Sequence, residues 1–179
     1  EAYRTAASDR KADMEPRGAA LAVEMRAVMR ELIKLDPERA LQRAVPEAVR
    51  RVLPSGVQQH LEQRVDDRGD FTVTAAGAPL DDRVIPKRAE FATVSLADGV
   101  SYEAFTYGRR SLEPSRVGIP IHGIALDSRM ALSEWPGRVL EPVERAEAKQ
   151  ALSGEPVCPT SKQMTSATGE ETAIKIGKE

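Results

Sequence analysis

Cysteine is almost missing from this chain, which has one, Cys158, among its 179 residues. A single thiol excludes an internal disulfide framework and any zinc site built from several thiolates. Aromatic residues are also scarce, at 4% of the sequence. No apolar run reaches the roughly 18 to 20 residues of a membrane-spanning helix, so we predict no membrane span.

A basic excess is missing too, because 26 lysine and arginine residues face 28 acidic residues and the formal net charge is -2. A nucleic-acid-binding domain would carry clustered positive charge, so we expect no nucleic-acid partner. The pairs Arg50-Arg51 and Arg109-Arg110 are interspersed with acids, which predicts a solvated surface of mixed charge. The hydrophobic fraction of 41% is nevertheless sufficient for a packed core.

Catalytic motifs are a further absence. The sequence has two histidines and contains no HExxH, GxSxG, GxGxxG or P-loop pattern. We expect His60 to be a surface residue and His122, which lies in an apolar run, to be a half-buried structural imidazole. Cys158 and His122 are the only cysteine–histidine combination for nucleophilic catalysis, and no local signature supports it. The sequence therefore predicts no catalytic residue, no cofactor and no bound metal.

Two short patterns could suggest binding. Arg68-Gly69-Asp70 spells a cell-adhesion tripeptide, but we attribute Gly69 to a turn between helix and strand that needs a permissive residue. Asp66, Asp67 and Asp70 could contact a calcium ion, since hard cations prefer clustered carboxylates. The loop lacks the full calcium-binding pattern, so we interpret the three aspartates as solvated turn residues.

Composition and periodicity divide the chain into segments at 1–67, 68–142 and 143–179. The first segment is helical, and its longest helix is predicted over 16–35 with a buried apolar stripe at i, i+4 and i+7. The stripe consists of Leu21, Met25, Val28, Leu32 and Leu35, widened by Met29 and Ile33. Asp36 followed by Pro37 predicts the N-cap and first turn of a second helix. Ser55 could cap a last helix that extends to Val65.

The second segment changes to the period of two that is typical of strands. Asp98-Gly99 between two alternating apolar runs predicts a type I′ hairpin, in which both central residues have positive φ. Residues 119–126 and 130–135 predict a strand and its return, with the turn at Asp127-Ser128. The third segment begins with a short helix over 141–152 and continues as an extended tail or linker, to which 172–176 could add one strand.

These elements predict an α+β fold. The short N-terminal helices would pack on one face of a small, bent antiparallel sheet or partial barrel. We expect the first two segments to form one domain and the third to be a loosely held C-terminal tail.

The middle of the chain resembles a domain on the leader side of large secreted bacterial proteins. The resemblance covers 25–142 and rests on the runs VDDRGDFTV, YEAFTYGRR, GIPIHGIALDSRMALSE and RVLEP, preceded by LDPERALQRAVPEAVRRVLPSGVQQHLEQRV. In those proteins the domain looks like a proregion upstream of gametolysin-like or immune-inhibitor-like zinc metallopeptidase domains. The zinc-binding helix motif of the peptidase is missing from this sequence.

The resemblance implies a non-enzymatic extracellular module, a proregion-like folding or targeting domain of a larger secreted protein after leader removal. Its partner would be a downstream domain of the same precursor or other copies of the chain. The alternative is a standalone structural or assembly subunit whose C-terminal tail contacts neighbours. Under the first reading Cys158 could occupy the open zinc position of a following domain. It could equally form a disulfide beyond Glu179 or be an ordinary tail cysteine.

Overall fold

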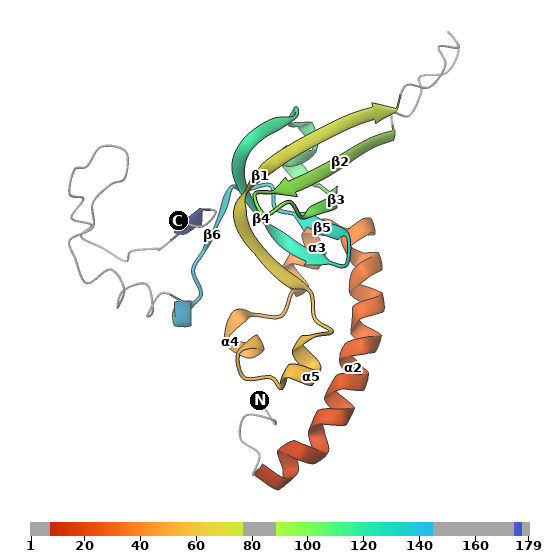
Figure 1. Cartoon of the computed structure of the whole chain (residues 1–179), viewed down its shortest axis with the longest axis vertical. Helices are drawn as coiled ribbons and strands as arrows, with labels where there is room; N and C mark the ends of the chain where they lie inside the picture. The colour runs from red at the N-terminus through yellow and green to blue at the C-terminus, as the bar shows by residue number, and fades with distance from the viewer. Residues whose placement is uncertain (1–7, 77–88, 145–173, 177–179) are drawn as a thin grey trace, which may run out of the picture.

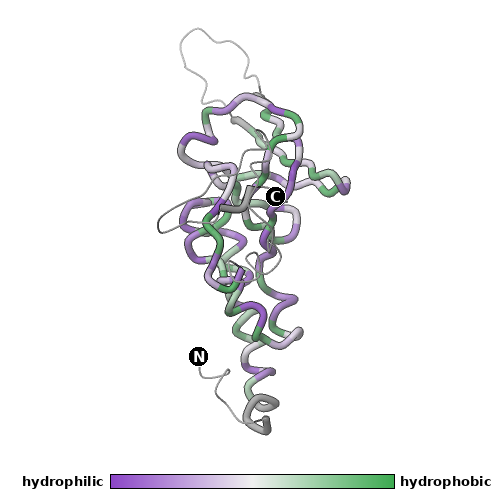
Figure 2. Tube along the Cα trace, turned by 90° about the vertical axis from the view of Figure 1, so that its left-hand side faces the viewer, coloured by the Kyte–Doolittle hydropathy of each residue, from purple (hydrophilic) through white to green (hydrophobic). Residues whose placement is uncertain are grey.

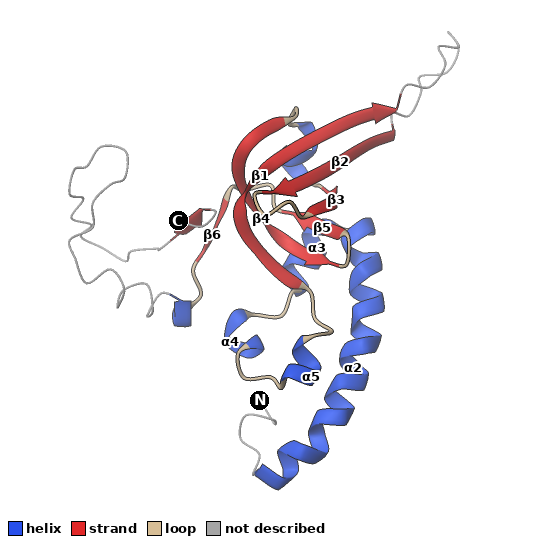
Figure 3. Ribbon diagram, viewed as in Figure 1, coloured by secondary structure: helices blue, strands red, loops and turns tan. Residues whose placement is uncertain are grey.

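The computed structural model of the chain describes residues 8–76, 89–144 and 174–176. It confirms the α+β class, with most helices gathered below and along one side of a small closed barrel (Figures 1 and 3). The helices are α2 (Ser8–Leu35), α3 (Pro37–Arg43), α4 (Glu47–Arg50), α5 (Ser55–Gln58) and the 3-10 helix η1 (Gly108–Leu112). None of the described helices is long and apolar enough to cross a membrane.

Five strands close the barrel in the order β1-β2-β3-β5-β4. They are β1 (Gln63–Ala76), β2 (Ala89–Leu96), β3 (Ser101–Phe105), β4 (Arg116–Leu126) and β5 (Arg129–Leu132). A five-stranded Greek-key barrel is the architecture of the OB fold. All pairs are antiparallel except β3 and β5, which run parallel. This parallel contact was not predicted, because local periodicity does not report which strands meet when a sheet closes.

Strand β1 bends because it belongs to both halves of the barrel, pairing first with β4 and then with β2. The β1–β4 register shifts between Gly69 and Phe71, which marks a β-bulge. A Cβ on Gly69 would lie 2.5 Å from the carbonyl oxygen of Ser95 on β2, so the close approach of the two strands requires glycine. The prediction that Gly69 forms a turn was therefore wrong, since β1 runs unbroken through it.

Two apolar clusters hold the domain together. The barrel interior is filled by side chains that are at most 1% exposed, namely Phe71, Val94, Ile121, Met130 and Leu132. Outside the barrel, α2 and α3 pack against β4 and β5. This second cluster contains Met29, Ile33, Ala40, Ala44, Ile124, Leu126 and Ala131. The barrel is thus a packed core, and two helices cover part of its outer surface.

Helix α2 differs from its prediction at both its start and its buried face. It begins at Ser8 and contains Pro16, which was expected at its start. The predicted buried face is confirmed for Met29 and Ile33, which widen the stripe, and Leu32 is partly buried. It was wrong for the other stripe residues, Leu21, Met25, Val28 and Leu35, which are exposed. Periodicity identifies the apolar arc of a helix but not the part of that arc that the domain covers.

The other helix boundaries follow the sequence signals in part. Asp36 caps α3 as predicted, since its Oδ1 accepts a hydrogen bond from the Arg39 amide at 3.0 Å and Pro37 is the first helical residue. The helix predicted to extend to Val65 was too long. It ends at Gln58, and Val65 lies in β1 with its side chain in the barrel core.

Both predicted hairpins are present, but one has a different turn. The two-residue turn at Asp127-Ser128 joins β4 to β5, with positive φ at Asp127. Between β2 and β3 only Gly99 has positive φ, so Asp98-Gly99 is not a type I′ turn. The Gly99 amide donates to the Leu96 carbonyl at 3.0 Å. This bond defines a three-residue loop in which a turn is followed by a left-handed glycine.

A small separate sheet lies beside the barrel. Strand β6 (Gly137–Val139) pairs antiparallel with β7 (Ile174–Ile176), so the strand expected near 172–176 forms but does not join the barrel. Residues 142–144 are helical, as predicted for the start of the third segment. The rest of that helix, most of the tail and Cys158 lie outside the described residues.

Candidate functional site

The two histidines have different surroundings. His60 follows α5, is partly exposed, and its ring lies 3.4 Å from the side-chain nitrogen of Gln59. His122 lies on β4 with its side chain 12% exposed, in agreement with the expected half-buried imidazole. Its Nδ1 lies 2.5 Å from Oδ1 of Asp66, which is directly opposite on β1. An ionised carboxylate can only accept, so Nδ1 of His122 donates in this hydrogen bond.

Asp66 is the centre of a polar network that the sequence did not reveal. Its second oxygen accepts from Arg138 of β6, with Nη2 at 3.2 Å and Nε at 3.3 Å. Arg138 also forms an ion pair with Glu144. Glu141 accepts from the Glu47 amide at the start of α4, at 3.1 Å. The network therefore joins β1, β4 and β6, and the adjoining Glu141 links this region to α4.

The electrostatics of this network hold its carboxylates in the ionised form. Burial alone would raise the pKa of Asp66, but the hydrogen bond and charge of His122 and the charge of Arg138 together lower it to about 2. The hydrogen bond from Arg138 likewise lowers the pKa of Glu144 to about 2, against the effect of burial. The same hydrogen bond, which Glu144 accepts, raises the pKa of Arg138 above its ordinary value. Each partner thus stabilises the charge of the other.

An open pocket of about 550 Å³ adjoins His122. Its walls are mostly apolar and include Trp135, while Ser133 adds a hydroxyl. Ser133 is the neighbour of His122 across the strands, and its amide donates to the His122 carbonyl at 2.8 Å. The Ser133 hydroxyl instead accepts from the Trp135 amide at 3.2 Å. Among the described residues no hydrogen bond joins the Ser133 hydroxyl to the His122 imidazole, so the pair Ser133 and His122 lacks the nucleophile–base contact of a hydrolase.

The three aspartates that could have bound calcium point to different partners. Asp66 belongs to the network, and Oδ1 of Asp67 accepts from the Arg68 amide at 2.7 Å. Oδ1 of Asp70 accepts from the Gly118 amide at 2.9 Å. They were predicted to be turn residues and are strand residues instead. In the described part of the chain, no group of three histidine, cysteine or acidic side chains could hold a metal ion.

The arginine pairs are less solvated than predicted. Arg110 is buried, donates to the Ser133 carbonyl at 3.2 Å and to Glu113 at 2.7 Å, and lies over Phe71. Arg109 lies over the ring of Trp135, 5.5 Å from its centroid. The interpretation as a solvated surface of mixed charge was therefore wrong for Arg110, because its aliphatic chain and its guanidinium group both contact other residues inside the fold.

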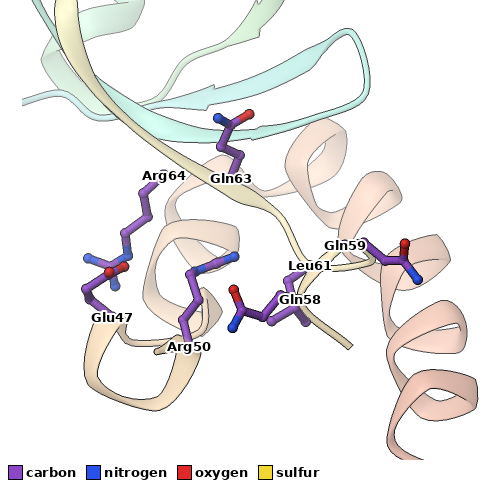
Figure 4. Close-up of a pocket in the computed structure, with 7 residues that line it drawn as sticks. All are labelled: Glu47, Arg50, Gln58, Gln59, Leu61, Gln63 and Arg64. Carbon is purple, nitrogen blue, oxygen red and sulfur yellow. The ribbon is translucent and has the colours of Figure 1, made fainter. Parts of the chain in front are cut away.

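A second pocket, of about 370 Å³, lies where α4, α5 and the start of β1 meet (Figure 4). Its lining is polar apart from one leucine and consists of Glu47, Arg50, Gln58, Gln59, Leu61, Gln63 and Arg64. Arg50 was expected on the solvated surface, but its side chain is only 16% exposed and pairs with Glu62, which is buried. No local sequence pattern indicates this site, because its residues come from three separate elements.

The outer face of α2 carries the apolar stripe that was expected to be buried. Leu21, Met25, Val28 and Leu35 are 57%, 45%, 69% and 78% exposed. Hydrophobic and hydrophilic residues alternate along this helix (Figure 2), which packs against α3, α5, β4 and β5. This face of α2 is therefore an apolar surface that the described part of the chain leaves uncovered.

Comparison with protein-family models finds no match, and no curated protein or solved structure matches the chain.

Proposed function

We propose that this chain is a non-enzymatic protein-interaction module, a proregion-like domain of a larger secreted bacterial protein, as its sequence resemblance suggests. The observation that supports the proposal is the exposed stripe of α2. Leu21, Met25, Val28 and Leu35 of the stripe are exposed, and Leu32, which completes the spacing of four and three residues, packs partly against the second apolar cluster. This spacing is that of a coiled-coil seam, so the partner would contribute a helix.

The stripe offers part of the apolar area that would hold a partner. Burying a Leu, Val or Met side chain completely contributes roughly 1.5 to 3 kcal/mol. The four most exposed residues of the stripe are about half to three quarters exposed. Covering them would contribute roughly 4 to 7 kcal/mol, so apolar side chains of the partner must add to this to offset the cost of association.

The test compares Val28→Lys with Ala27→Lys, since both positions are exposed on α2 and only Val28 lies in the stripe. A photo-crosslinker placed at 28 or at 27 in the natural gene product identifies what covers each face. We expect crosslinks from 28, either to a second copy or to a downstream segment, and none from 27. Sedimentation should show that Val28→Lys weakens the association while Ala27→Lys does not. A monomeric product without crosslinks from 28 would refute the proposal.

The competing function is a standalone assembly subunit that contacts its neighbours through the C-terminal tail. It would require β7 to pair with β6 of a neighbour, whereas here the two strands pair within one chain. Mixed-isotope crosslinking between β6 and β7 separates the two cases, because exchanged tails give crosslinks between chains and the proregion-like module gives them within one.

A further inference from the structure

The imidazole of His122 uses one ring nitrogen and leaves the other available. Its Nδ1 is held by Asp66, which Arg138 holds in turn, so the ring presents Nε2 in a defined direction. Among the described residues no hydrogen bond to Nε2 is formed, and the buried side-chain atoms that lack a partner both belong to arginines. Nε2 is therefore accessible to solvent rather than sealed inside the fold.

His122 borders the mostly apolar pocket beside β6. The volume of about 550 Å³ lies in the range of roughly 300 to 1,000 Å³ that small-molecule sites occupy. Arg138 also lines the pocket, but its guanidinium is already paired with Asp66 and Glu144. An apolar pocket with a few oriented polar groups is the usual form of a ligand site, and here His122 supplies an oriented nitrogen that has no partner.

Trp135 indicates which class of ligand suits this pocket. Its side chain lines the pocket, and the residue is 53% exposed. Arg109 lies over the Trp135 ring but does not line the pocket. The ring therefore already has a cation, and a second cation in the pocket would be repelled by the first. A neutral aromatic ring, in contrast, can pack against Trp135 in an offset or edge-to-face arrangement.

We propose that this pocket binds a phenolic ring, which packs against Trp135 while its hydroxyl forms a hydrogen bond with Nε2 of His122. A hydroxyl suits this nitrogen in either protonation state of the imidazole, because it donates to the neutral ring and accepts from the protonated one. A carboxylate suits the site less well, since Asp66 and Glu144 already place two negative charges at Arg138. No residue of α2 lines the pocket, so the proposal does not depend on the exposed stripe.

The experiment titrates the full chain with p-cresol, the tyrosine side chain as a free molecule, and follows the indole N–H signal of Trp135 by NMR. This signal is unambiguous because Trp135 is the only tryptophan in the sequence. Toluene is the matched control ligand, since it lacks only the hydroxyl. His122→Asn is the test variant, because its amide can still donate to Asp66 but is too short to place an acceptor at the Nε2 position. His60→Asn is the matched control variant, since His60 does not line the pocket.

We expect saturable shifts with p-cresol and about fivefold weaker binding of toluene, the contribution of one hydrogen bond. His122→Asn should bind the two ligands equally, while His60→Asn should keep the difference between them. Trp135→Leu, followed through the ring protons of His122, should weaken both ligands alike because it removes the aromatic wall. N-acetyl-tyrosinamide is a second arm. Binding of it and p-cresol identifies a tyrosine of a polypeptide as the source, and binding of p-cresol alone identifies a free phenol.

Three results would overturn the proposal. A Trp135 signal that does not saturate with p-cresol would show that no phenolic ring occupies the pocket. Equal binding of toluene and p-cresol to the wild type would show that the hydroxyl is not recognised. A preference for p-cresol that persists in His122→Asn would mean that another group binds the hydroxyl. The comparison of the two ligands on the wild type needs no variant, so it tests the proposal even if His122→Asn does not fold.

Discussion

Replacing Asp66 by asparagine should remove a pH-dependent part of the stability. In the folded chain the pKa of Asp66 is lowered from 3.8 to about 2 by His122 and Arg138, against the effect of burial. Stability from this shift is present above pH 3.8, the value for the unfolded chain, and is lost as the pH falls toward 2. A shift of about two units corresponds to about 2.5 kcal/mol, which solvent screening reduces to about 1 to 2 kcal/mol.

The assay is urea unfolding of the wild type and Asp66→Asn at pH 6, 4, 3 and 2.5. At pH 6 we expect the variant to lose at least this 1 to 2 kcal/mol, because Arg138 keeps its charge and loses one of its two carboxylate partners. The difference should shrink between pH 4 and 2.5. Asp70→Asn is the control on the same strand, since Asp70 accepts from one backbone amide and should lose less at pH 6. A difference between wild type and Asp66→Asn that stays constant with pH would refute the reasoning.

Two further predictions concern packing. Ile33→Ala should lower the free energy of unfolding by about 2 to 5 kcal/mol, because Ile33 is fully buried. Val28→Ala on the same helix should change the free energy of unfolding of a monomer by no more than about 0.5 kcal/mol. Equal losses of the two variants in thermal unfolding would show that the exposed face of α2 is misplaced. Gly69→Ala should cost about 1 to 3 kcal/mol, because its Cβ would lie 2.5 Å from the Ser95 carbonyl oxygen, and an unchanged melting temperature would contradict this close approach.

The parts of the fold that local chemistry determines could be predicted from the sequence. The Asp36-Pro37 helix start is one example, because a capping side chain and a proline act on their own neighbours. The turn at Asp127-Ser128 is another. The β2–β3 hairpin was placed correctly, but its turn type was wrong because Asp98 keeps a negative φ and only Gly99 is left-handed.

The features that depend on distant residues could not be predicted. Asp66 was interpreted as a solvated turn residue, and its role comes from Arg138, 72 positions later in the sequence. Gly69 was attributed to a turn because the strand that comes close to it, β2, begins only at Ala89. The pocket between α4, α5 and β1 has the same origin, since Arg50 and Arg64 belong to different elements that meet only in the folded chain.

The packing of α2 favours a role beyond its own domain. The helix buries small residues such as Ala22, and a Cβ on Gly18 would lie 3.2 Å from Val57 of α5, so this face allows close approach. The same face buries the larger side chains of Met29 and Ile33, while Leu21 and Val28 remain exposed. Each buried methylene contributes about 0.8 kcal/mol, so burying Leu21 and Val28 as well would stabilise the domain further. The observed orientation gives up that stabilisation in the isolated chain and recovers it only when a second apolar surface covers the stripe.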